Sequence, residues 1–264
     1  MDYDDAYANA PYIPGADDIL NGLADTAERF RSKLGSRANL AISYGPSDRQ
    51  AYDHFLPVGK PEGILIFVHG GYWLRFDRSY WSHFASGALE RGWAVAMPSY
   101  DLCPDVRISC ITQQIAQAVM QIADETEGPI ALSGHSAGGH LVSRMMAPGM
   151  LSQSVMDRVV HVAPISPLAD LEPLIHTQMN DAFRMDKDMA RAESPMLQPV
   201  PVIPATVWVG ADERPVFLDQ AMWLGDAWQC KQVVVPNRHH FDIIDDLADP
   251  NSEMVKSLIE SAVK

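Results

Sequence analysis

A glycine-rich stretch around one serine constrains the fold of this 264-residue chain more than any other feature. It reads Gly134-His135-Ser136-Ala137-Gly138 and fits the pattern G-x-S-x-G, in which a serine occupies a strained turn between a strand and a helix. The apolar residues 130–132 before it are typical of a short buried strand, and apolar residues recur at helical spacing from Leu141 to Met146. The sequence therefore predicts Ser136 at a strand-to-helix junction, as a candidate nucleophile.

Strands and helices are predicted to alternate along most of the chain. The apolar run Ile64–Val68 has no period of two, which favours a strand covered on both faces, as in a parallel sheet. Such alternation predicts an α/β chain with a mostly parallel central sheet and helices on both faces. We expect strands over residues 39–44, 51–56, 63–69, 93–97, from 130 to the serine turn, 159–163, 205–209 and 232–235, and helices from 17 or 18 to 34 and over 79–91, 108–125, 216–228 and 252–263.

The chain length suits a single α/β domain, and no linker-like stretch divides it. We therefore expect one domain over residues 1–264 with two additions. Residues 1–38 are interpreted as an extended arm that rests on an aromatic or apolar surface, followed by a helix that stops at Gly35. Residues 166–204 are rich in proline, methionine, aspartate and arginine and interrupt the alternation. We interpret them as a cap or lid over the carboxyl edge of the sheet.

Composition excludes several classes of partner and of location. The net charge of -14 argues against nucleic acid and against an anionic membrane, because both select for clustered lysine and arginine. The sequence shows no secretory signal. No apolar stretch approaches the length of a membrane span, roughly 20 residues. The three cysteines lack C-x-x-C spacing and are typical of reduced thiols. We expect a cytoplasmic protein with a small-molecule substrate, and the sequence leaves a homodimer open.

A serine nucleophile needs a histidine base and an acid that orients it, and in this fold they follow in the order serine, acid, histidine. The late strands end in Gly210-Ala211-Asp212-Glu213 and in the loop 236–242, which satisfy that order. His240 is preferred over His239 as base because it directly precedes Phe241 and a helical segment. The acid stays open between Glu213, three residues after the strand's last glycine, and Asp212, the commoner and shorter residue type for the role.

The residues His239-His240-x-Asp242 also suit part of a metal site. No other cluster with the right number of ligands accompanies them, so we expect no metal and no cofactor.

A second glycine motif, His69-Gly70-Gly71-Tyr72-Trp73, follows the predicted central strand. Lipases and esterases carry an HGGG-type motif at this place, where glycines let backbone N–H groups turn toward the substrate. We predict that the N–H groups of Gly71, Tyr72 and Ala137 form an oxyanion hole. His69 and His135 are interpreted as structural residues rather than bases.

Taken together, these motifs resemble the serine-hydrolase type of kynurenine formamidase (arylformamidase) in the α/β-hydrolase superfamily, near the carboxylesterases. The resemblance rests on the two glycine motifs, on His240-Phe241-Asp242, and on residues 170–174 with Ser194-Pro195. It covers most of the chain beyond residue 60 and part of the arm. It implies hydrolysis of N-formylkynurenine in tryptophan breakdown, through a formyl-enzyme on Ser136. The family usually has aspartate as the acid, whereas the matching position here is Glu213.

Four aromatic residues are candidates for the substrate pocket: Trp73, Tyr80, Trp81 and Phe183. One of three arginines is a candidate to receive a substrate carboxylate: Arg75, Arg78 or Arg184.

Two alternatives remain open. A general carboxylesterase acting on small esters would use the same triad. A ligand-binding protein that has lost catalysis would keep the fold, but such proteins usually lack a triad member. A lipase is disfavoured, because residues 166–204 are polar.

Overall fold

The structure, a computed structural model, describes residues 2–260. Its centre is an 8-stranded sheet in the order β1-β2-β4-β3-β5-β6-β7-β8. Strand β2 is antiparallel to both of its neighbours, and β3 to β8 run parallel to one another, as the alternation of strands and helices predicts. The strands are β1 (Ala38–Ser43), β2 (Ala51–Phe55), β3 (Ile64–Val68), β4 (Ala94–Pro98), β5 (Ile130–His135), β6 (Val159–Ile165), β7 (Thr206–Gly210) and β8 (Lys231–Val235).

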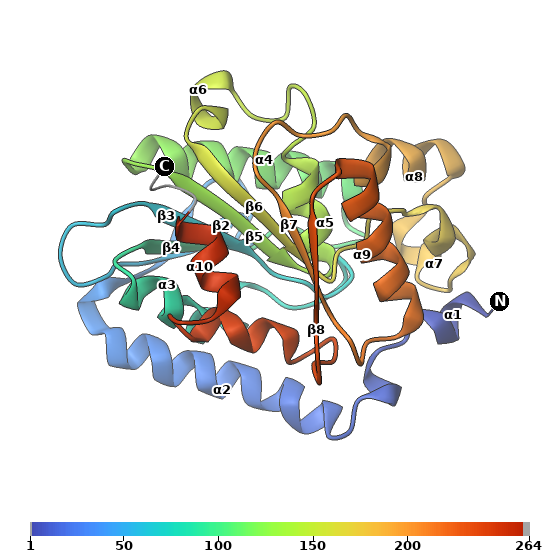
Figure 1. Ribbon diagram of the computed structural model, residues 1–264, viewed down its shortest axis with the longest axis horizontal. Helices are drawn as coiled ribbons and strands as arrows, with labels where there is room; N and C mark the ends of the chain where they lie inside the picture. Colours follow the sequence, from blue (N-terminus) through green and yellow to red (C-terminus); the bar gives the residue numbers. More distant parts are fainter. Residues whose placement is uncertain (1, 261–264) are drawn as a thin grey trace.

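Helices cover both faces of the sheet (Figure 1). The helices are α1 (Tyr3–Ala6), α2 (Ala16–Leu34), α3 (Ser86–Glu90), α4 (Ile108–Glu125), α5 (Ala137–Arg144), α6 (Gln153–Met156), α7 (Asn180–Phe183), α8 (Lys187–Glu193), α9 (Pro215–Trp228) and α10 (Glu253–Ile259). Strand β3 explains the two layers: its five residues are all buried. Ile64, Ile66 and Val68 pack in the core with α4, α5 and α9. Leu65 and Phe67 pack in the opposite core with α3 and α10. A strand between two cores needs apolar residues on both faces, which accounts for the missing period of two.

Two predicted segments differ in detail from the structure. The expected helix over 79–91 is divided into short 3-10 turns, Arg78–Tyr80 and Ser82–Ala85, before α3. Asp77 caps the first turn, since its carboxylate accepts a hydrogen bond from the Ser79 backbone N–H at 2.7 Å. The predicted helix over 252–263 is α10, capped by Ser252, and residues 261–263 of that prediction lie outside the described residues.

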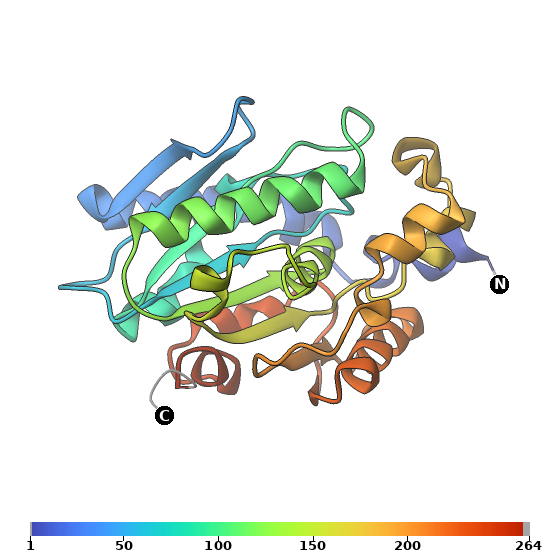
Figure 2. The same cartoon turned by 90° about the horizontal axis from the view of Figure 1, so that it is seen from above.

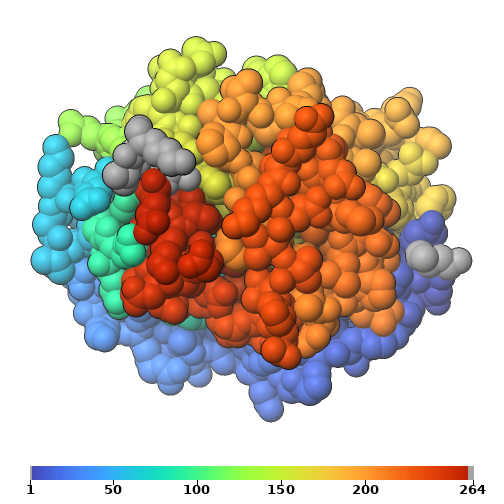
Figure 3. Space-filling view, in the orientation of Figure 1, coloured from blue at the N-terminus to red at the C-terminus, as the bar shows by residue number. Residues whose placement is uncertain are grey.

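Contrary to the expected extended arm, the first residues form α1 and a 3-10 turn at Ala10–Tyr12. Asp2 caps α1 by accepting a hydrogen bond from the backbone N–H of Asp5 at 3.2 Å. Helix α2 begins at Ala16 after Gly15 in the left-handed conformation, and it ends before Gly35 as predicted. Figure 3 shows the first residues along the lower right of the molecule, beneath the segments around α7 and α9.

Residues 166–204 connect β6 to β7 and hold α7, α8 and two 3-10 turns, Glu172–His176 and Pro195–Leu197. Figure 2 shows this segment beyond the carboxyl ends of the central strands, next to α1. Tyr3 of α1 stacks on His176 with ring centroids 5.5 Å apart, and Asp4 accepts a hydrogen bond from the Gln178 backbone at 2.7 Å. The N-terminal arm and the predicted cap therefore meet, while a lid function stays a prediction. Within residues 2–260, no helix combines the length and apolar character needed to cross a membrane.

Candidate active site

Ser136 occupies a sharp turn between β5 and α5. Its backbone has φ 56° and ψ -117°, a strained conformation for a residue with a side chain, and its N–H donates to the Ile165 carbonyl at 2.8 Å. The flanking glycines make the turn possible. A Cβ on Gly138 would lie 1.9 Å from the Val68 carbonyl oxygen, and one on Gly134 would lie 2.3 Å from the Gly138 carbonyl oxygen. The packing of strand, turn and helix thus requires glycine on both sides of Ser136.

His240 and Glu213 come together after the last two strands. The Nδ1 of His240 donates a hydrogen bond to Glu213 Oε2 at 2.6 Å, and both side chains are buried. The other carboxylate oxygen, Oε1, accepts from the Gly210 backbone N–H at 2.8 Å and from the Ser166 hydroxyl. Asp212 is exposed to solvent. Of the two candidate acids, the structure brings Glu213 to the histidine, held by three donors.

Ser136 and His240 line the same cavity, whose volume is about 40 Å³. Apolar residues from α2, together with Phe76 and Trp81, make up much of its wall. A second cavity of about 210 Å³ also borders His240, between the N-terminal arm and the loop around Arg214. The nucleophile candidate and the base candidate therefore face one space, while the base also borders a second.

The loop after β3 lies directly against Ser136. A Cβ on Gly70 would approach the His135 carbonyl oxygen to 2.8 Å and Ser136 Cβ to 3.1 Å. Gly71 and Tyr72 both have positive φ, 110° and 53°, and both line the cavity. Across residues 2–260, no backbone carbonyl accepts from the N–H groups of Gly71, Tyr72 or Ala137. These three donors remain available for a substrate oxygen, as an oxyanion hole requires.

Two buried histidines support this loop. His69 donates from Nδ1 to the Gly70 carbonyl at 2.8 Å, and its ring stacks on Tyr100 with centroids 4.4 Å apart. Burial lowers the pKa of His69 to about 4. Burial and the neighbouring His240 lower the pKa of His135 well below its usual value. Both side chains are therefore neutral at pH 7, in keeping with structural rather than basic roles.

The aromatic candidates are divided between the cavity and the core. Trp81 lines the cavity, and Tyr80 packs edge-on against Phe76 behind the wall. Trp73 and Phe183 differ from the expectation, because they are fully buried against one another with ring centroids 5.6 Å apart. The physical reason is local: Tyr72 lines the cavity, while the adjacent Trp73 turns to the opposite side, into the core beside α5.

The arginine candidates also differ in position. Arg75 is exposed, lines the cavity and makes no ion pair within the part of the chain that the structure describes. Arg78 instead binds Asp53, with its Nε 2.8 Å from the carboxylate. Arg184 is exposed at the end of α7, where its carbonyl accepts a hydrogen bond from Arg107. Arg75 is thus the candidate that reaches the cavity.

The residues considered for a metal site form a turn. The backbone N–H of His239 donates to Asp242 Oδ1 at 2.7 Å, and His239 Nδ1 accepts from the backbone N–H groups of Phe241 and Asp242 at 3.2 Å. His240 points away from this turn to Glu213. Over residues 2–260, no group of three or more His, Cys, Asp or Glu side chains is arranged to hold a metal ion.

Three further residues of the site escape the sequence analysis. Ser166 donates a hydrogen bond to Glu213 and directly follows the end of β6. Functional side chains commonly lie at the carboxyl ends of parallel strands, so this position in the sequence could have indicated Ser166. Tyr7 accepts from the Tyr72 hydroxyl through its backbone carbonyl at 2.8 Å, and Asn9 lines both cavities. No local sequence pattern indicates a role for Tyr7 or Asn9, because the residues that they contact are distant in the sequence.

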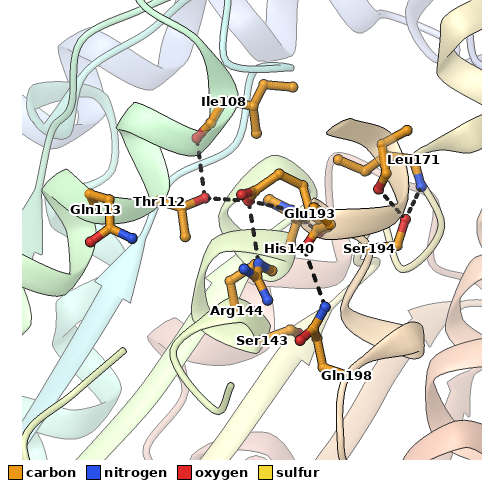
Figure 4. Close-up of polar contacts among 12 residues, drawn as sticks. Ile108, Thr112, Gln113, His140, Ser143, Arg144, Leu171, Glu193, Ser194 and Gln198 are labelled. Atoms are coloured by element: carbon orange, nitrogen blue, oxygen red, sulfur yellow. Dashed lines mark hydrogen bonds and ion pairs between the residues drawn. The ribbon is translucent and has the colours of Figure 1, made fainter. Parts of the chain in front are cut away.

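A separate buried polar cluster ties α8 to α5 and α4 (Figure 4). Glu193, at the end of α8, accepts hydrogen bonds at Oε2 from the Thr112 hydroxyl at 2.7 Å and from Arg144 Nε at 3.3 Å. The Nε2 of His140 donates to the backbone carbonyl of Glu193 at 2.8 Å, and the ring of Trp73 packs edge-on against His140. This cluster fixes the predicted cap to the helix that begins at the serine turn.

Comparisons with known proteins agree with this architecture. The profile of the alpha/beta hydrolase fold family matches residues 65–234. The chain is 24% identical to kynurenine formamidase from Salmo salar, over 93% of this chain and 90% of that protein. It is 26% identical to the kynurenine formamidase of Drosophila melanogaster, over 74% and 71% of the two chains.

Two solved structures share the whole fold. A Silicibacter protein provisionally named a thioesterase superposes with a TM-score of 0.96 at 56% identity, covering 98% of this chain and 99% of that one. Esterase B from Lactobacillus rhamnosus superposes with a TM-score of 0.71 at 17% identity, covering 96% and 97%. The predictions of an α/β-hydrolase fold and of a hydrolase are confirmed.

Proposed function

The chain belongs to the alpha/beta hydrolase fold family, and we propose that it is a serine hydrolase that cleaves aryl formamides, with N-formylkynurenine as its substrate. The observation that carries the proposal is the pair formed by His240 and Glu213, 2.6 Å apart, at a cavity that Ser136 also lines. In this proposal Ser136 is the nucleophile, His240 the base and Glu213 the acid.

The proposed reaction proceeds in two halves. His240 Nε2 takes the hydroxyl proton of Ser136 while the serine oxygen attacks the formyl carbon, and the carbonyl oxygen becomes an oxyanion. The intermediate collapses when His240 returns the proton to the leaving nitrogen, which departs as the free arylamine and leaves formyl-Ser136. Water then attacks the formyl group by the same route and releases formate.

Each remaining part of the site has a role in this scheme. The Nδ1–H of His240 is held by Glu213, which fixes the tautomer that leaves Nε2 free to accept a proton and stabilises the imidazolium that forms. The N–H groups of Gly71, Tyr72 and Ala137 receive the oxyanion. Loss of one such donor typically costs about 2.7 to 4 kcal/mol of barrier lowering.

The substrate is proposed from three observations. The kynurenine formamidase from Salmo salar aligns with 93% of this chain. The cavity at Ser136 is small, about 40 Å³, which suits a short acyl group, and formyl is the smallest. Its wall combines Trp81 and Phe76, which suit an aryl ring, with Arg75. The guanidinium of Arg75 makes no ion pair among residues 2–260 and suits a carboxylate.

A second candidate activity is the hydrolysis of short acyl thioesters. It is favoured by the provisional name of the Silicibacter protein, which is 56% identical to this chain. The triad and oxyanion donors would serve thioesters and simple esters equally well, because all three substrate classes pass through the same tetrahedral intermediate. The leaving group, not the acyl chemistry, separates the candidates.

The test is steady-state hydrolysis of N-formylkynurenine, p-nitrophenyl acetate and a short-chain acyl thioester, with Ser136→Ala as the control. We expect the largest kcat/KM for N-formylkynurenine and loss of all activity in the variant. A larger kcat/KM for the thioester or the ester would identify that class, rather than formamides, as the substrate. Binding of N-formylkynurenine without turnover, unchanged in Ser136→Ala, would favour a ligand-binding protein instead.

A further inference from the structure

Asn9 occupies a position that no other arm residue shares. It lies between α1 and the 3-10 turn at Ala10–Tyr12, and the residue is 8% exposed. Asn9 and His240 are the two residues that line both the cavity of Ser136 and the neighbouring cavity beside Arg214. The boundary between the two spaces is therefore made by the proposed base on one side and an amide on the other.

The neighbouring Tyr72 hydroxyl indicates the orientation of this amide. The Tyr72 hydroxyl donates its only proton to the Tyr7 carbonyl at 2.8 Å, so toward any other neighbour it can act only as an acceptor. Burial raises the pKa of Tyr72, and the Asn9 side chain acts in the opposite direction, as a hydrogen-bond donor does. The NH₂ group of Asn9 therefore faces Tyr72, and Oδ1 lies on the other side of the amide.

The remaining amide oxygen has no partner. Asn9 Oδ1 is buried and accepts no hydrogen bond from any residue of the described chain. A buried acceptor without a donor is costly, and in a folded protein it calls for an explanation. At the border of a reaction cavity, the simplest explanation is a donor that arrives with the substrate.

We propose that Asn9 Oδ1 accepts a hydrogen bond from the N–H of the scissile formamide and thereby selects amides over esters and thioesters. The inference rests on the function proposed above. A formamide nitrogen carries a hydrogen, whereas the leaving oxygen of an ester and the leaving sulfur of a thioester carry none. A site that holds an N–H group discriminates strongly against analogues without it, because its own acceptor is then left unpaired.

The same contact assists the departure of the leaving group. In the tetrahedral intermediate the nitrogen has one hydrogen and one lone pair, and the lone pair must point at His240 to receive the proton. Asn9, holding the hydrogen from the opposite side of the boundary, directs the lone pair to the base. No proton passes to Asn9, which acts as an acceptor throughout.

The test compares Asn9→Leu with the wild-type enzyme on two formyl substrates, N-formylkynurenine and phenyl formate. Leucine keeps the approximate shape and removes the acceptor. We expect kcat/KM for N-formylkynurenine to fall by about 10- to 100-fold, while kcat/KM for phenyl formate changes by no more than about twofold. Equal losses on both substrates, or no loss on either, would overturn the role of Asn9.

A matched variant separates this role from docking of the arm. Asp5→Ala removes the ion pair between Asp5 and Arg214, 2.8 Å long, and loosens the arm without touching the cavity at Ser136. Any effect of this variant is expected to be equal on the two substrates. If the wild-type enzyme cleaves phenyl formate but not N-formylkynurenine, the proposed function itself fails and the role of Asn9 fails with it. If the wild type cleaves both and Asn9→Leu lowers both alike, the role of Asn9 alone fails.

Discussion

Two buried histidine–glutamate pairs occur among residues 2–260, and they differ in geometry and in surroundings. At the candidate active site, His240 donates directly to the Glu213 carboxylate at 2.6 Å. Beneath the predicted cap, the nearest approach of His140 to the Glu193 carboxylate is 4.0 Å. There the Thr112 hydroxyl and Arg144 bind the carboxylate, and His140 donates to the Glu193 backbone instead.

The difference shows what a base needs besides a nearby acid. His240 borders two cavities and so can meet a substrate, whereas His140 is fully buried and packs against Trp73. Burial lowers the pKa of His140 to about 4, so this side chain is neutral at pH 7. Glu193 balances the charge of Arg144. In the proposed mechanism the first pair takes part in proton transfer, whereas the second holds helices together.

The largest expected effect comes from Glu213→Gln. The amide keeps the size of the side chain but can stabilise the wrong tautomer of His240, so kcat should fall by about 10⁴-fold. The melting temperature should change little, which circular dichroism would establish alongside the kinetics. A kcat within tenfold of the wild-type value would remove Glu213 from the proposed triad.

Glu193→Ala should have the opposite profile. Removing this carboxylate leaves Arg144 buried without its counter-charge, and the loss in free energy of unfolding should be about 3–5 kcal/mol. Urea unfolding measures the loss, and kcat of the folded enzyme should stay near the wild-type value. Glu193→Gln is the milder control, since its amide oxygen can still accept from Thr112. A large fall in kcat without loss of stability would contradict the contrast between the pairs.

Acid should lower the free energy of unfolding through His140. Because its pKa is about 4 in the folded protein and about 6.5 in the unfolded chain, only the unfolded chain takes up this proton between those values. The contribution of His140 to the free energy of unfolding is complete above pH 6.5, declines as the pH falls toward 4, and changes no further below pH 4. Between the two limits, this contribution changes by about 3 kcal/mol.

Urea unfolding of His140→Gln from pH 7 to pH 4 measures this contribution. Glutamine can donate to the Glu193 carbonyl but cannot titrate, so the free energy of unfolding of the variant should decline less steeply than that of the wild type. Parallel declines would show that His140 does not carry the effect. Other buried histidines, such as His69, would then account for the acid sensitivity.

The smallest expected effect is that of Asp212→Asn. Asp212 is exposed and adjacent to Glu213 in the sequence, so it is a matched control for the proposed acid. We expect kcat/KM within about twofold of the wild-type value and no change in stability beyond about 0.5 kcal/mol. A loss comparable to that of Glu213→Gln would reverse the assignment of the two carboxylates.

The sequence predicts those parts of the molecule whose cause is local. The serine turn follows from its glycines, because a larger residue does not fit there. A Cβ at position 138 would lie only 1.9 Å from the Val68 carbonyl oxygen. The order of strands and helices follows from periodicity. The spacing of three residues after Gly210 also favours Glu213, and the structure places Glu213 at His240.

Other parts depend on partners that are distant in the sequence. Aromatic residue type cannot tell Trp81, which lines the cavity, from Trp73, which fills the core. The importance of Asn9 emerges only when the arm, the loop at Tyr72 and His240 are placed together. The short turns of the arm likewise depend on contacts with the predicted cap.

The docking of the arm has a consequence for the order in which the enzyme can be assembled. Tyr7 is translated before its partner: its hydroxyl accepts from Gln220, 213 positions later, and Asp5 pairs with Arg214, 209 positions later. The entropy of closing so long a loop rises only slowly with its length, by about 0.6 kcal/mol for each doubling. The time at which the arm docks is therefore set by the synthesis of its partners rather than by the entropy of closing the loop. Asn9 can reach the border of the cavity only after β7 and α9 have formed, so this arm is among the last segments to take its place although it precedes them in the sequence.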